Sequence, residues 1–304
     1  MTVTAPPKPP PAGVPVELRR SSLSPRRRFV DGLSKVMMTL ALVVAIVPLA
    51  LVVFEVIKRG GSAITWAFLT EDVPNQARRA TGGIYPAIIG TLIITGMATL
   101  IAVPLGVLGA IYLNEYGKKK PLARLVRTMA DVMTGVPSIV MGLFIYVTWV
   151  SLFREQTGFA GALALACLML PVVIRSTEEI LRLVPDELRQ ASLALGARRW
   201  RTIISVVLPA GISGITSGSL LAVARAAGET APLIIVVGLT NTTNWNLFDG
   251  DNTALPALIF KNASEPFAAA NTRAWGAALT LVTIVLVFTI VARLISARFA
   301  SKDR

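Results

Sequence analysis

The sequence predicts an all-α polytopic membrane protein, and three observations support that fold class. Of the 304 residues, 54% are hydrophobic and only 15% are charged, whereas a soluble domain carries about 25% charged residues. Several uncharged runs reach the length of about 20 residues that a membrane-spanning helix needs. The Lys and Arg residues gather at the ends of these runs, as in other membrane proteins. The net charge of +13 is therefore assigned to membrane topology and contact with lipid, and no nucleic-acid partner is expected.

Residues 1–28 form the first segment, which is rich in Pro and Arg and has too little apolar surface to build a core. We expect a disordered, basic cytoplasmic tail there, followed by a single transmembrane domain over residues 29–304. No small-residue cleavage site closes the first apolar run, so this region is not interpreted as a cleavable signal peptide.

Six transmembrane helices are expected in that domain. The second span has glycines at 90, 96, 106 and 109. Where a helix surface carries no side chain, a neighbouring helix can approach closely in lipid. The third span contains the kink-prone stretch Gly135-Val136-Pro137-Ser138. The predicted spans are about 36–54, 86–113, 130–153, 159–177, 212–238 and 274–294.

The fifth span is the hardest to place, because the uncharged stretch around it is too long for one helix. Splitting it into two spans would put Arg225 and Glu229 in a tight turn between them. We therefore expect one span, with residues 202–211 lying along the membrane interface and residues 240–272 forming a polar outer loop. An even number of spans puts both termini on one side. That side then holds 21 Lys and Arg residues against 7 on the other, which places both termini in the cytoplasm.

The loop between spans four and five, residues 178–209, is polar and basic and contains a short amphipathic helix. Pro185, Asp186 and Glu187 form a helix-start signal, and Gly196 suits the position just past a helix end. The pattern alone fits either a helix that docks on a partner or one that lies on anionic lipid.

Arg225 and Glu229 are the only charged residues between Arg201 and Phe248. Four residues apart on a helix, their side chains can meet. One interpretation is a static ion pair that makes an intramembrane Arg tolerable. The other is a functional pair, the default hypothesis for ionisable residues inside a membrane. Arg175, at the inner end of span four, fits a functional role and snorkelling to the lipid headgroups equally well. Asp131 is explained as an acid at a helix start.

Several chemistries are excluded by composition. The sequence has no His and one Cys, Cys167, which lies in an apolar run and is expected to pack there. We therefore predict no catalytic residue and no metal site, which argues against a membrane enzyme. No phosphate-binding G-x-x-x-x-G-K-[ST] loop is present, so no nucleotide cofactor is expected on this chain.

A family resemblance adds to these inferences. The residues Gln190-Ala191-Ser192, then Gly196, then Leu208-Pro209 resemble the EAA loop of type I ABC importer permeases in residue type and spacing. In that family the loop fits a cleft in a separate ATPase subunit. The resemblance implies that ATP is used by a partner subunit and that this loop is a cytoplasmic coupling helix. The implied docking residues are Gln190, Ala191, Ser192, Gly196, Leu208 and Pro209. Gln190 stands where the family has Glu, which weakens the expectation of an acid at that position.

Further stretches resemble the PstA-type permeases of phosphate-specific transporters. They include Gly135-Val136-Pro137-Ser138, Arg175-Ser176-Thr177-Glu178-Glu179 and Arg225 through Pro232, which ends in Glu-Thr-Ala-Pro. The resemblance implies a permease subunit that passes inorganic phosphate inward across a bacterial cell membrane. Its substrate path would include Arg225, Glu229 and Arg175.

The implied partners are a second homologous permease subunit in a heterodimer, an ATP-binding cassette ATPase dimer and an extracytoplasmic phosphate-binding protein. Two alternatives stay open: a permease for another oxyanion such as sulfate, and a passive anion channel, against which the docking loop argues.

Overall fold

A computed structural model describes residues 25–117 and 120–300, and within these ranges all regular secondary structure is helical. Most of the predicted tail, residues 1–24, lies outside the described residues. The chain divides into two compact units, residues 1–54 and 55–304.

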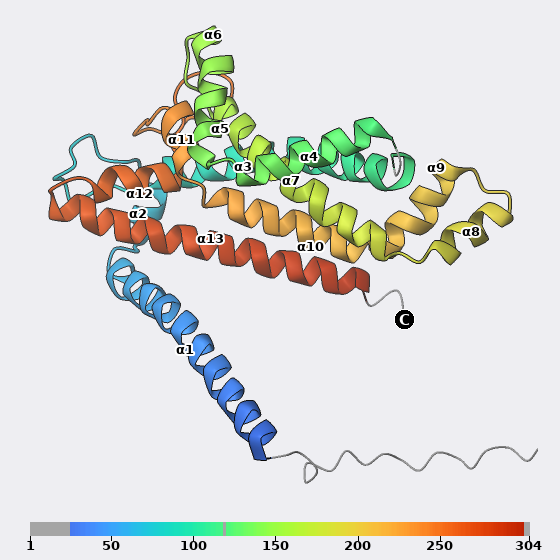
Figure 1. Ribbon diagram of the computed structural model, residues 1–304. Helices are drawn as coiled ribbons and strands as arrows, with labels where there is room; N and C mark the ends of the chain where they lie inside the picture. The colour runs from blue at the N-terminus through green and yellow to red at the C-terminus, as the bar shows by residue number, and fades with distance from the viewer. Residues whose placement is uncertain (1–24, 118–119, 301–304) are drawn as a thin grey trace, which may run out of the picture. The chain divides into compact units, whose positions relative to one another are not determined.

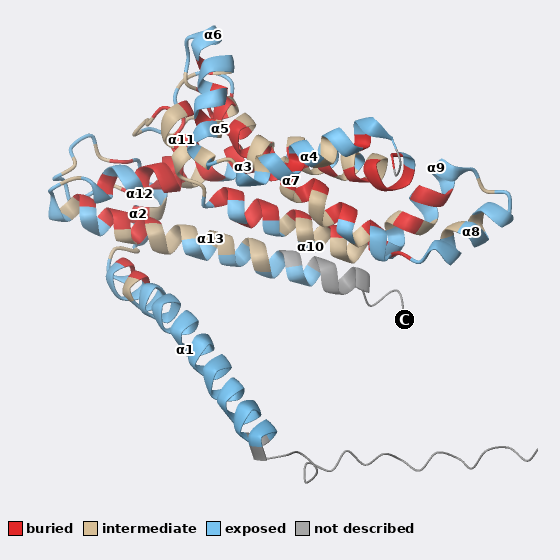
Figure 2. Ribbon diagram, in the orientation of Figure 1, coloured by how far each residue is buried: buried red, intermediate tan, exposed pale blue. Residues whose placement is uncertain are grey.

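Most of the first unit is helix α1 (Pro25–Gly61), which contains the expected span 36–54 and extends it at both ends. The described side chains of this helix up to residue 54 are exposed (Figure 2). They are mainly apolar, and Phe29–Gly61 is long and apolar enough to cross a membrane. A helix of this kind satisfies its backbone internally, and its apolar surface suits lipid or another membrane helix.

The second unit is built from long helices joined by short ones (Figure 1). In chain order they are α2 (Trp66–Thr70), α3 (Tyr85–Ile111), α4 (Pro121–Gly135), α5 (Ser138–Ile145), α6 (Ser151–Phe153), α7 (Gly158–Leu183), α8 (Asp186–Ala194), α9 (Arg199–Thr202), α10 (Leu208–Ala227), α11 (Ala231–Val236), α12 (Leu255–Ala263) and α13 (Ala268–Ala300). Single π-helical turns follow α3 (Tyr112–Tyr116), α5 (Tyr146–Val150) and α9 (Ile203–Val207).

The core lies where α7 packs between α3 and α10, with α13 against α10 (Figure 1). Small residues allow this close packing. A Cβ atom on Gly106 would come within 2.7 Å of the Val173 side chain, and one on Gly218 within 2.6 Å of Ser176 Oγ. The expectation for span two is met at Gly90 and Gly106 but not at Gly96, which has open space around it.

Five described helices are long and apolar enough to span a membrane, or six if α4 and α5–α6 count as one broken span. The chain bends by 108° between these two segments. The bend follows from Pro137, which has no N–H to continue the helix and holds Val136 in an extended conformation (φ −73°, ψ 129°). The expected third span, 130–153, is therefore corrected, because residues 130–135 belong to α4, which begins at Pro121.

The expected fifth span, 212–238, is also corrected. One candidate span runs from Arg199 to Ala227, so residues 202–211 continue into the membrane-length helix and are not a separate interfacial piece. Pro209 lies at the start of α10, directly after the π-helical turn Ile203–Val207. The outer loop 240–272 differs as well, because it contains α12, with Leu255 and Leu258 buried.

Candidate functional site

The depth of Arg225 in the helix bundle follows from the packing of α10 against α7. A shallow pocket beside Arg225 and Glu229 is lined by Leu168, Met169 and Val172 of α7. Residue 168 lies ten positions after the first residue of α7, Gly158, or about 15 Å along a helix of about 39 Å. The Arg225–Glu229 pair is therefore level with the middle of the bundle.

Arg225 lies in the last turn of α10 and Glu229 just beyond its end. The Arg225 Nε and Glu229 Oε1 atoms are 3.6 Å apart, and the Arg225 side chain is 73% exposed while that of Glu229 is 22% exposed. A separation of 3.6 Å is an ion pair but not a hydrogen bond. The sequence correctly predicted that the two side chains meet, and the structure adds that the guanidinium faces outward from this chain.

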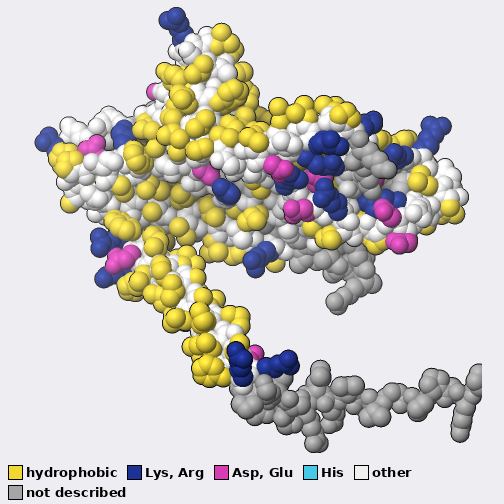
Figure 3. Space-filling view, in the orientation of Figure 1, with side chains coloured by type: hydrophobic (Ala, Val, Ile, Leu, Met, Phe, Trp, Pro, Cys, Tyr) yellow, Lys and Arg dark blue, Asp and Glu magenta, His cyan; other side chains and the backbone are white. Residues whose placement is uncertain are grey.

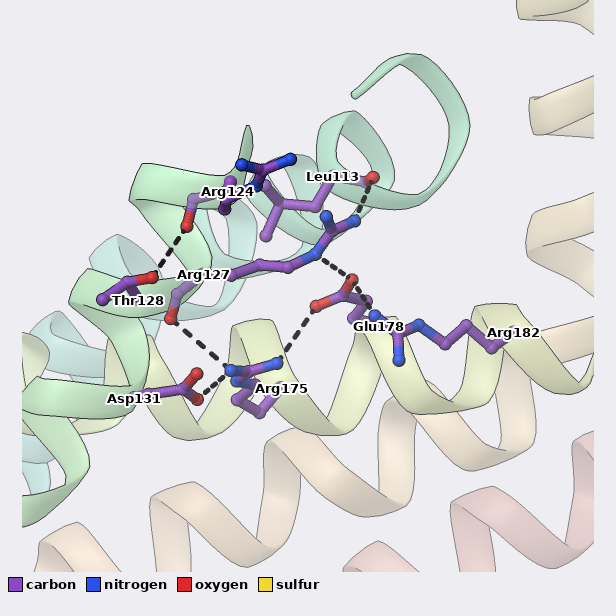
Figure 4. Close-up of polar contacts among 8 residues, drawn as sticks. All are labelled: Leu113, Arg124, Arg127, Thr128, Asp131, Arg175, Glu178 and Arg182. Atoms are coloured by element: carbon purple, nitrogen blue, oxygen red, sulfur yellow. Dashed lines mark hydrogen bonds and ion pairs between the residues drawn. The ribbon is translucent and has the colours of Figure 1, made fainter. Parts of the chain in front are cut away.

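Arg175 joins a second charged group, drawn in Figure 4. One of its terminal nitrogens pairs with Asp131 of α4, and Nη1 lies 3.6 Å from Glu178 Oε2. Nη2 also donates to the Arg127 carbonyl at 3.5 Å. Asp131 cannot be explained as a helix-start acid, because α4 begins ten residues earlier, at Pro121; it is the counter-ion of Arg175.

Glu178 lies at the centre of this group and was not among the predicted site residues. Its side chain is 1% exposed, and Oε1 accepts from Arg127 Nε and Arg182 Nη2, each at 2.7 Å. Arg127 also donates to the Leu113 carbonyl at 2.7 Å. The spacing of Arg175, Glu178 and Arg182 on one helix is a signal for contact, but the contribution of Arg127 from α4 is a tertiary contact that the sequence does not reveal.

The Arg225–Glu229 pair and the charged group around Glu178 lie at successive levels along α7. From the level of Arg225, beside residues 168–172, the arginines at 175 and 182 continue toward the end of the helix over about 20 Å. Figure 3 shows Lys and Arg side chains, with Asp and Glu among them, gathered over α4 and the neighbouring end of α7. This arrangement offers positive charge at several levels, which suits a path for an anion.

The predicted docking loop forms α8, preceded by Pro185 and with Asp186 and Glu187 in its first turn. Gly196 has φ +82°, as expected for a residue that closes a helix. Its N–H donates to the Leu193 carbonyl at 2.9 Å.

The predicted docking residues divide into two sets. Gln190, Ala191 and Gly196 are exposed, and so is Pro209 in the first turn of α10. The Ser192 hydroxyl lies 2.9 Å from that of Thr202, and Leu208 packs on a buried apolar cluster. These last two therefore hold the loop in place rather than present a free surface.

No group of three or more Cys, Asp or Glu residues suited to a metal ion occurs in the described part of the chain, which contains no His. The surroundings of Arg225 and of Glu178 offer charge and hydrogen-bond donors.

Comparisons with known proteins identify the family of the chain. Residues 102–301 match the family "Binding-protein-dependent transport system inner membrane component". The chain is 43% identical to phosphate transport system permease protein PstA 1 of Mycobacterium tuberculosis strain H37Rv, covering 95% of this chain and 94% of that protein. It is 42% identical to PstA of Yersinia pestis, covering 81% and 83%.

Among solved structures, a bacterial alginate ABC transporter in complex with a periplasmic protein bound to an alginate pentasaccharide matches with a TM-score of 0.63 at 15% identity, covering 90% of this chain and 96% of that one. The inward-facing MetNI methionine ABC transporter matches with a TM-score of 0.58 at 18% identity, covering 71% and 94%. These structures share the fold, which is that of type I ABC importer permeases. The chain belongs to the binding-protein-dependent inner membrane components and, within them, to the PstA-type phosphate transport system permeases.

Proposed function

We propose that this chain is the transmembrane permease subunit of an ATP-driven importer that moves inorganic phosphate into the cytoplasm. The observation that carries the proposal is the exposed guanidinium of Arg225 at mid-bundle depth, in a loose ion pair with Glu229. Its relatives are named as phosphate transport permeases, and phosphate is an anion whose oxygens match the donor fork of Arg.

The substrate path is proposed to run past Arg225, Glu229 and Arg175. Phosphate loses hydration when it enters the bilayer, and a nearby guanidinium offsets part of that cost. Because Arg225 faces away from its own chain, a second, homologous permease subunit is proposed to complete the wall of the path. Arg175, already paired with Asp131, would offer a second positive group closer to the α8 end.

The energy source is proposed to be a separate ATPase dimer that docks on α8, so that ATP is used by that partner and this chain binds no cofactor. An extracytoplasmic phosphate-binding protein would deliver the substrate at the opposite end. The test is uptake of labelled phosphate by cells that express the complete transporter, with unlabelled sulfate as competitor. Sulfate that competes as well as unlabelled phosphate would favour a general oxyanion permease, and uptake without the ATPase would favour a passive channel.

The orientation in the membrane gives a first prediction. Both termini and α8 are proposed to be cytoplasmic, because positive residues concentrate on that side. In a Cys167→Ala background, Leu195→Cys and Trp245→Cys should be labelled by an impermeant thiol reagent from opposite faces of the membrane. Both sites suit labelling, since Leu195 is 89% exposed and Trp245 is 64% exposed. Labelling of both cysteines from the same face would contradict the proposed topology.

Gly196 gives a second prediction. It has φ +82°, and a Cβ atom added to it would meet no other atom within 4 Å, so the effect of a substitution comes from backbone strain alone. A β-branched side chain in this conformation costs about 1–2 kcal/mol, whereas Asn tolerates it. Gly196→Val should reduce co-purification of the ATPase while the chain stays in the membrane, and Gly196→Asn should not. Equal ATPase binding by both variants would refute the docking role of this helix end.

A further inference from the structure

Two residues of helix α8 are partly buried against the rest of the unit, and both are polar. Arg189 and Ser192 are partly buried, whereas every other residue of α8 is exposed. These two residues are three positions apart and therefore lie on the same face of the helix. The exposed residues include Leu188 and Leu193, at 45% and 48%. The two least exposed positions of α8 are therefore polar.

Arg189 makes most of these contacts. Its side chain is 11% exposed, and its Nε and Nη2 atoms lie 3.2 and 3.1 Å from Glu115 Oε1. Nη2 also donates to the Leu181 carbonyl at 2.7 Å, and Nη1 to the Val184 carbonyl at 2.6 Å. These carbonyls lie at the end of α7, where backbone acceptors lack helical partners and positive charge is favoured. One guanidinium therefore joins α8 both to the end of α7 and to the turn that follows α3.

Glu115 is equally well held on the α3 side. It is 5% exposed and lies in the π-helical turn Tyr112–Tyr116. Asn114 Nδ2 donates to its Oε1 at 2.8 Å, and its carbonyl accepts from Arg199, whose guanidinium also lies 5.0 Å from the centre of the Tyr116 ring. Single π-helical turns within helices frequently occur at functional sites. Arg189 of α8 and Arg199 of α9 both contact this turn, which directly follows α3.

We propose that Arg189 and Glu115 form a latch that passes the movement of α8 to α3 and α7 together. The inference rests on the proposed function, because it concerns how the docking helix drives the permease. Beside the latch, the Ser192 hydroxyl of α8 lies 2.9 Å from that of Thr202. A neutral contact of this kind is weaker than a charge-assisted one. Arg189 and Glu115 act here as positioning residues, through the elements that they join.

The deciding variant is the double change Glu115→Gln with Arg189→Gln in the complete transporter, with its second permease and ATPase. Either single change leaves a buried charge without its partner and destabilises the chain on that account, whereas the double change leaves none. We expect the ATPase still to co-purify and hydrolyse ATP, while phosphate transported per ATP falls about tenfold, a typical size for coupling between sites. For Arg189→Lys, phosphate transported per ATP should lie between the values of the wild type and the double variant, because an ammonium lacks the planar fork of a guanidinium. Arg293→Gln removes an exposed arginine of α13 as the matched control and should match the wild type.

A second measurement tests the latch independently of which substrate is transported. Hydrogen exchange is measured in the complete transporter with and without ATP. In the wild type, exchange at 112–116 and at 186–194 should change together on ATP binding; in the double variant only 186–194 should respond. An unchanged response at 112–116 in the double variant overturns the latch, as does loss of ATPase binding in that variant. Failure of the wild type to import phosphate would instead contradict the proposed function, while the exchange data would still decide on the latch.

Discussion

Phosphate uptake is expected to fall to background when Arg225 and Glu229 are both replaced by Gln, although the protein should reach the membrane at normal abundance. The Arg225 side chain is 73% exposed and not hydrogen-bonded to Glu229, so the fold does not depend on the pair. What the double variant lacks is the positive charge that offsets the loss of hydration of the anion at mid-bundle depth. The measurement is phosphate uptake normalised to membrane abundance.

Single variants define what Arg225 contributes. Arg225→Lys keeps the charge but loses the planar donor fork, so partial uptake is expected. Arg225→Gln alone leaves Glu229 with its charge uncompensated beside the path and should transport as poorly as the double variant. Arg293→Gln, which removes an exposed arginine of α13, serves as the control. Wild-type uptake by the double variant would show that the pair is a static ion pair, and Arg225 would no longer be assigned to the path.

Local signals in the sequence predicted local features well. The apolar runs indicated the long helices, and the residues from Pro185 to Gly196 predicted α8 together with the positive φ at its end. The Pro137 kink was visible as a tendency, but neither its bend of 108° nor the contact of α5 with α11 could be predicted from the local sequence. Helix α12 was missed because its short apolar run lies between polar Asn- and Thr-rich segments, and a short run alone does not distinguish helix from loop.

The charged groups show a sharper limit. Arg225 and Glu229 are close in sequence, so their contact followed from helical spacing. The contacts of Glu178 with Arg127 and of Glu115 with Arg189 join segments far apart in the chain. A single sequence shows that each of these residues is charged but not which partner it finds. Burial then decides their importance, because a deeply buried carboxylate is costly without a partner.

Glu178 provides the test of that statement, with its neighbour as control. Replacing Glu178 by Gln removes a carboxylate that is 1% exposed and pairs with Arg127, Arg182 and Arg175. The three arginines then face one another without their shared counter-ion, at an expected cost of about 3 kcal/mol. Glu179→Gln makes the same change of charge one residue along the chain, at an exposed position, and should cost less than about 0.5 kcal/mol.

The measurement is the fraction of detergent-solubilised permease that stays folded across a temperature series, beside its abundance in the membrane. Glu178→Gln should unfold at a lower temperature and accumulate less, while Glu179→Gln should follow the wild type. Combining Glu178→Gln with Arg127→Gln should recover part of the loss, because it removes the least exposed of the three arginines, 22% exposed in the structure. Equal stability of the two single Glu variants would show that the arginines are adequately solvated without Glu178. The group around Glu178 would then have no structural role, and its charges would be explained only by the passage of the anion.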